Sequence, residues 1–281
     1  MNTDKHRYIE KIKKVFYLCP SVSICGFKLS FLFFAAFFIL NGCSVKEAKT
    51  DFELLNEGQK NFANRRFDRA EENFKKLLDD HPDSKLRIHA MMGLADSLFR
   101  ADKFQEAAFQ YKEFYELYPV HNDTLKSRFY KGMSEFSEMK SADRDQTFTK
   151  NALEEFKKIA SNPDYANSRF YEVSEKKIEE CKRALAEHIF FIGKFYFRTA
   201  SYQSVISRMN SLITEYPGEP YEDEAIYYLA ESYYREESFK KALAEFERLK
   251  EKYPVSRYFN TATVRIADIE NIEKMAKNDN Q

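Results

Sequence analysis

Residues 239–254 read FKKALAEFERLKEKYP, and three other stretches of the chain share their pattern. These are FDRAEENFKKLLDDHP from Phe67, FQEAAFQYKEFYELYP from Phe104 and YQSVISRMNSLITEYP from Tyr202. Each begins with an aromatic residue 15 positions before a Pro, with a small or β-branched residue 12 positions before that Pro and a bulky one eight before it. Because Pro cannot continue a helix, each stretch predicts a helix that ends near its Pro.

Another small residue lies 12 positions before the small or β-branched one in each of these four units. These residues are Gly58, Ala95, Gly193 and Ala230. Two helices approach closely only where small residues face each other and large residues fill the neighbouring gaps. The units therefore predict helix pairs, and their pattern resembles the tetratricopeptide repeat. The last unit matches that repeat at Leu229, Ala230, Tyr233, Ala242, Phe246, Leu249 and Pro254.

Two of the five units are irregular. In the third, about eight extra residues fall around 141–146, between its two predicted helices. In the fourth, 30 residues separate Pro163 from Gly193, which predicts a first helix lengthened at its N-terminal end. After the last repeat, residues 258–277 have another helical pattern, and we expect them to form the polar cap that repeat proteins require.

The first 42 residues have the pattern of an export signal. Six Lys and Arg residues precede the apolar run LSFLFFAAFFIL at 29–40. This run of 12 residues is too short for a transmembrane helix, which needs roughly 20. It has the length of the apolar segment of a signal peptide.

The run ends in Leu40-Asn41-Gly42-Cys43, which resembles the lipobox of bacterial lipoproteins. In that family the Cys thiol is joined to diacylglycerol, the signal is cut before it, and the new N-terminus is acylated. Several acyl chains anchor a protein stably where one chain would not. We therefore expect lipidation of Cys43, and Ser44 favours the outer membrane. The alternative is a short uncleaved anchor with a chance Cys.

These patterns predict an all-α fold of five helix-hairpin repeats with a C-terminal capping helix, preceded by a lipoprotein signal peptide. Cys181 is the remaining Cys of the predicted mature chain, and we expect it to be a small buried residue. The predicted parts are a signal peptide at 1–42, a lipidated tether at 43–50, repeats 1–3 at 51–163, repeats 4–5 with the lengthened helix at 164–254, and a capping helix and tail at 255–281.

The sequence contains no motif that is typical of catalysis or metal binding. No His pair has ligand spacing, and there is no CxxC pair, phosphate-binding glycine loop or GxSxG motif. We therefore expect no enzyme activity, no metal site and no cofactor except the covalent diacylglycerol and N-acyl lipid on Cys43. Outside residues 1–42 the chain has 39 basic and 43 acidic residues. A slightly acidic chain without a basic stripe argues against nucleic-acid binding.

Aromatic and polar clusters leave alternatives open. Most of the doubled aromatics are expected in the inter-helix core, while those beside a core position are candidates for a peptide groove. Asp143-Arg144-Asp145 is the most distinctive polar segment. It is either a turn whose polar groups are hydrogen-bonded within the chain, with an Asp that caps the next helix, or a loop that faces a partner or substrate. The aromatic clusters are Tyr227-Tyr228, Tyr233-Tyr234 and Phe190-Phe191 with Phe195-Tyr196-Phe197.

The whole arrangement, over residues 45–254, resembles the BamD family, lipoproteins of the β-barrel assembly machinery. The resemblance rests on the lipobox, five tetratricopeptide units, the inserted Asp143-Arg144-Asp145 and the lengthened helix. In the family an aromatic-rich helix, a short turn and an arginine in the following helix come next. HIFFIGKFYFRTASYQSVISRMNSLITEYP matches this pattern and makes the arginine Arg208. The second Asp of the family is commonly followed by Pro, whereas this chain has Gln146.

The resemblance implies a non-catalytic periplasmic adaptor, lipid-anchored to the periplasmic face of the outer membrane. It implies that the C-terminal repeats bind the POTRA domains of a BamA-like barrel subunit and that other lipoproteins of the complex are partners. The N-terminal repeats would receive unfolded outer-membrane proteins through an aromatic-ended C-terminal segment. A concave repeat surface can hold an extended peptide without catalysis. The alternative is a repeat-containing pilotin-type lipoprotein for secretin assembly, but the inserted loop and long helix favour the first reading.

Overall fold

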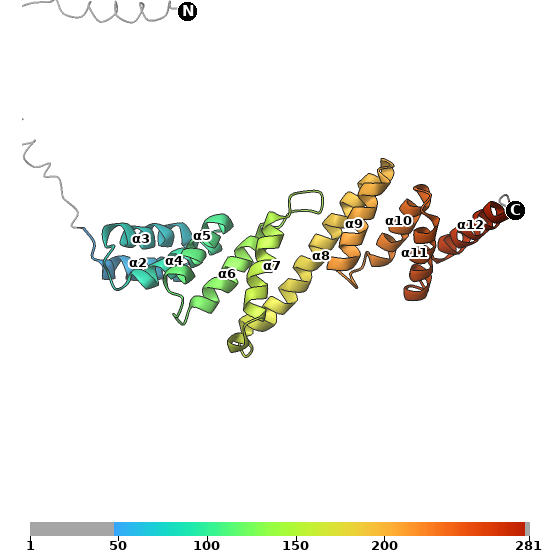
Figure 1. Ribbon diagram of the computed structural model, residues 1–281. Helices are drawn as coiled ribbons and strands as arrows, with labels where there is room; N and C mark the ends of the chain where they lie inside the picture. The colour runs from blue at the N-terminus through green and yellow to red at the C-terminus, as the bar shows by residue number, and fades with distance from the viewer. Residues whose placement is uncertain (1–47, 279–281) are drawn as a thin grey trace, which may run out of the picture. The chain divides into compact units, whose positions relative to one another are not determined.

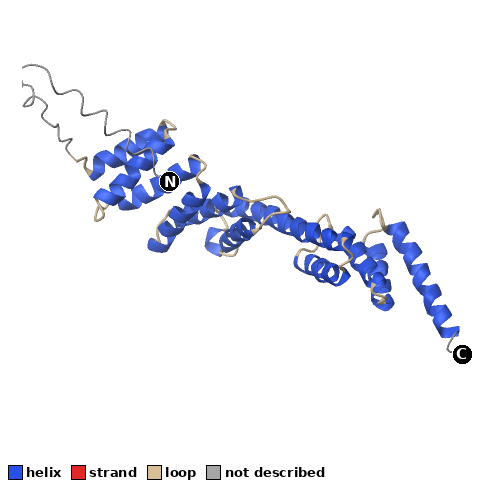
Figure 2. Ribbon diagram, turned by 90° about the horizontal axis from the view of Figure 1, so that it is seen from above, coloured by secondary structure: helices blue, strands red, loops and turns tan. Residues whose placement is uncertain are grey.

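The computed structural model describes residues 48–278. The predicted signal peptide and the lipobox Leu40-Asn41-Gly42-Cys43 lie outside these residues. Residues from Lys49 onward belong to one compact unit. In the described part every regular element is helical, as Figure 2 shows, which confirms the predicted all-α class. No helix among residues 48–278 is both long enough and apolar enough to span a membrane.

The helices follow one another along the chain, and each packs mainly against its neighbours in sequence (Figure 1). This nearest-neighbour packing is typical of repeat proteins. The helices are α2 (Asp51–Ala63), α3 (Phe67–Asp80), α4 (Arg87–Arg100), α5 (Phe104–Leu117), α6 (Thr124–Ser137), α7 (Thr147–Ala160), α8 (Arg169–Arg198), α9 (Tyr202–Glu215), α10 (Glu222–Arg235), α11 (Phe239–Lys252) and α12 (Phe259–Asn278), with a 3₁₀ turn at Pro163–Tyr165.

Proline ends the second helix of each regular pair. Pro82, Pro119, Pro217 and Pro254 each lie two residues beyond the last residue of a helix. The residue before each Pro has φ between −127° and −132° and ψ between 59° and 66°. The proline ring excludes the α conformation at the preceding residue, so the helix has to stop there. The predicted helix ends are confirmed.

The tight turn inside each regular pair requires a left-handed backbone. Arg65, Asp102, Ala200 and Glu237 have φ between 56° and 58°. A Cβ atom makes this conformation costly, and none of the four is glycine. The third pair instead joins α6 to α7 through residues 138–146, as the insertion predicted.

Small residues of one helix receive large side chains of the next. A Cβ atom placed on Gly58 would lie 2.6 Å from Cε1 of Phe74, and one on Gly93 would lie 2.6 Å from Cζ of the same ring. The bulky repeat positions are almost fully buried, including Phe74, Phe156 and Phe246. The predicted packing of small residues against large ones is therefore confirmed.

Helix α8 has 30 residues, and the predicted lengthening before Gly193 is confirmed. Cys181 lies buried in its middle as a free thiol, and burial raises the pKa of that thiol to about 12. This agrees with a packing role rather than a reactive one.

Most of the aromatic clusters lie in the core, as expected. Phe190 is buried, and the paired tyrosines of α10 are partly buried against the same hydrophobic cluster. Phe191 and Phe195 differ, because their side chains are 45% and 50% exposed on α8. These two remain the aromatic groove candidates.

We expect Gly58→Ala to lower the free energy of unfolding by about 1–2 kcal/mol. Alanine forms helices better than glycine by roughly 1 kcal/mol, so a net loss of stability would come from the collision of the new methyl group with Phe74. The Phe74 ring cannot easily move away, because it also packs against Gly93. Urea denaturation followed by circular dichroism measures the change. Gly132→Ala is the control with a smaller expected cost, because a Cβ there lies 3.0 Å from Phe156. Unchanged stability of Gly58→Ala would contradict this packing.

Candidate functional site

Arg208 lies on α9 with its side chain exposed to solvent. Its guanidinium group has no hydrogen-bond or ion-pair partner among residues 48–278. Arg208 begins next to the packed face of α9, since its Cβ would lie 3.6 Å from a Cβ atom placed on Gly193 of α8. The structure therefore presents a cation on α9 without a partner among residues 48–278.

The Asp143-Arg144-Asp145 segment is internally hydrogen-bonded. Asp145 Oδ1 accepts the backbone N–H of Thr147 at 2.9 Å, at the start of α7. Asp143 accepts the hydroxyl of Ser141. These hydrogen bonds to the charged forms lower the pKa of both carboxyl groups. Arg144 extends outward with its side chain 75% exposed, and its Nε lies 3.8 Å from Asp143.

Gln146 holds this loop together. Its side-chain amide donates to the backbone carbonyls of Ser141 at 3.0 Å and Arg144 at 3.1 Å, and its Oε1 accepts the Thr149 hydroxyl at 2.7 Å. Only 3% of Gln146 is exposed. Its φ is −105°, outside the range that proline adopts. The departure from the family's Pro thus has a structural role in this chain.

Helix α8 positions both predicted partner-binding features. His188 Nδ1 lies 2.7 Å from the backbone oxygen of Ala142, which attaches the inserted loop to α8. Gly193, further along α8, is the site where α9 approaches, with Met209 and Arg208 as the nearest residues. The loop and Arg208 are therefore supported by neighbouring parts of one helix.

A groove of about 760 Å³ lies between the second and third repeats. No motif in the sequence pointed to it, since its side chains come from three helices. Its charged residues have the i, i+3 or i, i+4 spacing of one helix face, which is the one signal that could have suggested it. The lining residues are Lys112, Tyr115, Glu116, Pro119, Arg128, Lys131, Glu154, Glu155, Lys158, Asn162 and Tyr165.

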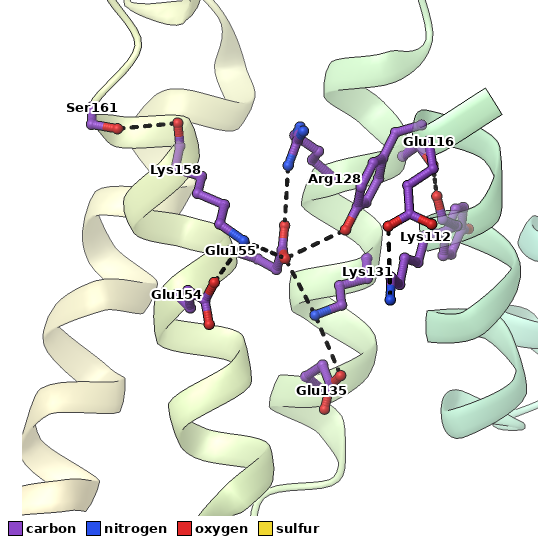
Figure 3. Close-up of polar contacts among 12 residues, drawn as sticks. Lys112, Glu116, Arg128, Lys131, Glu135, Glu154, Glu155, Lys158 and Ser161 are labelled. Carbon is purple, nitrogen blue, oxygen red and sulfur yellow. Dashed lines mark hydrogen bonds and ion pairs between the residues drawn. The ribbon is translucent and has the colours of Figure 1, made fainter. Parts of the chain in front are cut away.

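Glu155 is the centre of this groove (Figure 3). Only 3% of the residue is exposed. Its Oε1 lies 3.3 Å from Nζ of Lys131, 3.2 Å from Nζ of Lys158 and 3.5 Å from the Tyr115 hydroxyl. Its Oε2 lies 3.6 Å from the Arg128 guanidinium and has no hydrogen-bond partner. Several cations therefore surround one buried carboxylate.

The groove combines positive charge with aromatic surface. Four cations and three acids line it. The Arg128 guanidinium lies 4.2 Å from the centre of the Tyr115 ring. Burial, followed by the charge of Glu155, raises the pKa of the Tyr115 hydroxyl to about 12, so this hydroxyl stays protonated near neutral pH. The arrangement suits an anionic ligand with an aromatic side chain.

Metal ligation does not explain these features. Among residues 48–278, no group of three or more His, Cys, Asp or Glu side chains could hold a metal ion. The groove is lined by four ammonium or guanidinium groups and three carboxylates, and the cationic groups bind anions rather than metal cations.

Comparison with known proteins identifies relatives over most of the described chain. The family model described as "Outer membrane lipoprotein" matches residues 47–238, and a tetratricopeptide-repeat model matches residues 224–256. The chain is similar to the outer membrane protein assembly factor BamD of Rickettsia prowazekii, with 26% identity over 66% of this chain and 76% of that protein. It is also similar to BamD of Xylella fastidiosa, with 23% identity over 56% of each chain.

Solved structures of repeat proteins also resemble the chain. One is the TPR2AB-domain:pHSP90-complex of yeast Sti1, with 18% sequence identity and a TM-score of 0.38. The match covers 80% of this chain and 84% of that structure.

Proposed function

The chain belongs to the BamD family of outer membrane lipoproteins, and on this premise we propose that it is an adaptor for outer membrane protein assembly. Its relatives carry the name of assembly factor rather than of an enzyme. The family match favours this function over the pilotin alternative. The observation that carries the proposal is the groove around Glu155, which gives the adaptor a site for its clients.

The groove is proposed to bind the C-terminal segment of unfolded outer-membrane proteins. A chain that ends in an aromatic residue offers a carboxylate next to a ring. Arg128, Lys158 and Lys112 can bind the carboxylate, while the Tyr115 and Tyr165 rings can contact the aromatic side chain. Glu155 holds the cations in place before the client arrives, which reduces the entropy lost on binding.

The C-terminal repeats are proposed to bind a BamA-like POTRA-barrel subunit through Arg208. An exposed arginine without a partner among residues 48–278 is available for an acidic group on another protein. The inserted loop at Asp143-Arg144-Asp145 is proposed as a second contact, because Arg144 extends outward from a braced turn. Other lipoproteins of the assembly complex are further proposed partners.

The adaptor is proposed to be attached by lipid to the periplasmic face of the outer membrane. The lipobox Leu40-Asn41-Gly42-Cys43 precedes the repeats by a tether that ends at Thr50. Thr50 begins α2 with a capping box, in which its side chain accepts the N–H of Glu53 and Glu53 accepts the N–H of Thr50. The folded chain therefore begins seven residues after the proposed anchor.

Client binding is testable with a synthetic peptide that ends in Phe. We expect Arg128→Gln to weaken its binding about tenfold, because a charge-assisted hydrogen bond to the terminal carboxylate is lost. Isothermal titration calorimetry measures the change, and Lys150→Gln, on an exposed face of α7, is the control. A peptide with an amidated C-terminus should bind the parent weakly and be insensitive to Arg128→Gln. Equal affinity for the free acid and the amide would refute the carboxylate site.

Partner binding is testable by co-purification with the POTRA-barrel protein from detergent-solubilised outer membranes. We expect Arg208→Ala to reduce recovery of the partner several-fold at low salt and by less as salt increases, since salt screens the ion pair that Arg208 makes in the parent. Lys240→Ala removes another exposed cation of the C-terminal repeats and should leave recovery unchanged. Unchanged recovery for Arg208→Ala at every salt concentration would remove Arg208 from the interface.

Lipid attachment is testable by metabolic labelling with a fatty-acid analogue. We expect the label on the parent and none on Cys43→Ala, because the thioether requires the Cys43 sulfur. Cys181→Ala should keep its label, since that thiol is buried in α8. Label that persists on Cys43→Ala would overturn the lipobox assignment.

A further inference from the structure

Three arginines gather where α2 turns into α3. Arg65, Arg66 and Arg69 line a hollow of about 510 Å³, and all three are exposed. None of their guanidinium groups has an ion-pair or hydrogen-bond partner among residues 48–278. The one acid in the hollow, Asp68, is paired with Lys103 at 3.1 Å. We refer to Arg65, Arg66 and Arg69 as the arginine patch.

The repeat architecture does not require this charge. Four turns share the left-handed residue at the position of Arg65. The positions that match the arginine patch carry no such cluster in the other three turns. They are Asp102, Lys103 and Glu106 in the second repeat, Ala200, Ser201 and Ser204 in the fourth, and Glu237, Ser238 and Lys241 in the fifth.

The patch also opposes the local electrostatics of its helix. Arg66 is the N-cap of α3 and Arg69 lies in its first turn, where the helix dipole favours acidic side chains. Like charges that lie close together repel one another as well. Such an unfavourable placement of positive charge is expected at functional sites. A partner that offsets this charge has to be anionic.

An exposed face of α2 precedes the patch in the chain. Phe52, Asn56, Gln59 and Ala63 share one face by their helical spacing, and all are exposed. The Phe52 side chain is 63% exposed at the beginning of the helix. This face thus has one exposed apolar ring near its N-terminal end and uncharged side chains along it, and the arginine patch follows the C-terminal end of α2. An exposed aromatic ring and nearby arginines are residue types that contact anionic membrane surfaces.

The length of the tether indicates that the membrane is the anionic partner of the patch. Lys49 is six positions after the proposed lipid-bearing Cys43, and a chain of that length can span at most about 20 Å. Helix α2 has 13 residues and is about 20 Å long. Lys49 is held at the start of α2, since its Nζ pairs with Glu57 and its carbonyl oxygen lies 3.0 Å from His81 Nε2. Both ends of α2 therefore lie within reach of the membrane that holds the lipid.

We propose that the arginine patch and the exposed face of α2 form a membrane-contact surface, which binds the headgroups of anionic phospholipids. This inference rests on the proposed lipid anchor for the choice of occupant. Cations near an anionic bilayer add to the affinity that lipid chains supply. The contact would hold the first repeat against the membrane and restrict its rotation about the tether.

The test uses the mature chain, residues 43–281, made without lipid as Cys43→Ser, and flotation with vesicles. Vesicles of phosphatidylethanolamine with phosphatidylglycerol should bind the chain, and phosphatidylcholine vesicles should bind it weakly. Arg66→Gln with Arg69→Gln should weaken binding to the anionic vesicles about tenfold. Lys240→Gln with Lys241→Gln removes the same charge at the matching helix of the last repeat and should change binding less than about twofold.

A second readout reports the orientation of α2. The chain contains no tryptophan, so Phe52→Trp introduces a single reporter. Its emission should shift to shorter wavelength with anionic vesicles, and the shift should diminish in the arginine double variant. Equal losses in the two double variants, absent flotation, or flotation without an emission shift would each overturn the proposal. Because no lipid or partner protein is used, failure of the anchor or of client binding would give different results from failure here.

Discussion

The whole fold depends on one contact, in which a bulky side chain of a second helix lies against a small residue of the first. Phe74 against Gly58 and Met209 against Gly193 are instances. The side chain fills the space that the missing Cβ leaves, so two helix axes can approach closely. The same Phe74 ring also packs on Gly93 of the next pair, and one contact thus joins successive repeats. A chain built in this way needs no long-range pairing and is stabilised mainly by contacts between neighbours.

The parts of the fold that depend on short sequence spacing were predictable. Proline stops a helix wherever it occurs, and a small residue 12 positions before another marks a facing pair, so the helix ends and the third and fourth irregular units followed from the sequence. The turns were not predictable, because Arg65, Ala200 and Glu237 adopt a left-handed backbone that favours glycine. The hydrogen bonds that stabilise the inserted loop were not predictable either. In the sequence Gln146 is a polar residue where the family has Pro. In the structure its amide is buried, and its hydrogen bonds stabilise the loop in place of a rigid proline ring.

The groove around Glu155 lay beyond sequence reasoning for a different reason. Its charged groups come from α5, α6 and α7, and only the packing of those helices brings them together. Glu155 stands next to the core residue Phe156, where an uncompensated carboxylate would cost several kcal/mol. Arg128, Lys131 and Lys158 offset that cost. The acid therefore organises cations that would otherwise repel one another, and the groove gains a preformed positive surface without an increase in the charge of the chain.

The distribution of charge explains how a slightly acidic chain can offer several sites for anions. Net charge averages over the molecule, whereas recognition depends on groups within about a Debye length, roughly 8–10 Å at physiological salt. Along this chain the cations of the proposed sites are separated: the arginine patch lies in the first repeat, the Glu155 groove between the second and third, and Arg208 in the fourth. Groups that lie further apart than this length are screened from one another. The contacts proposed with a membrane, a client and a barrel subunit use cations of different repeats, so they do not compete for the same charge. An adaptor with these three proposed partners would need that independence, and the repeat architecture supplies it.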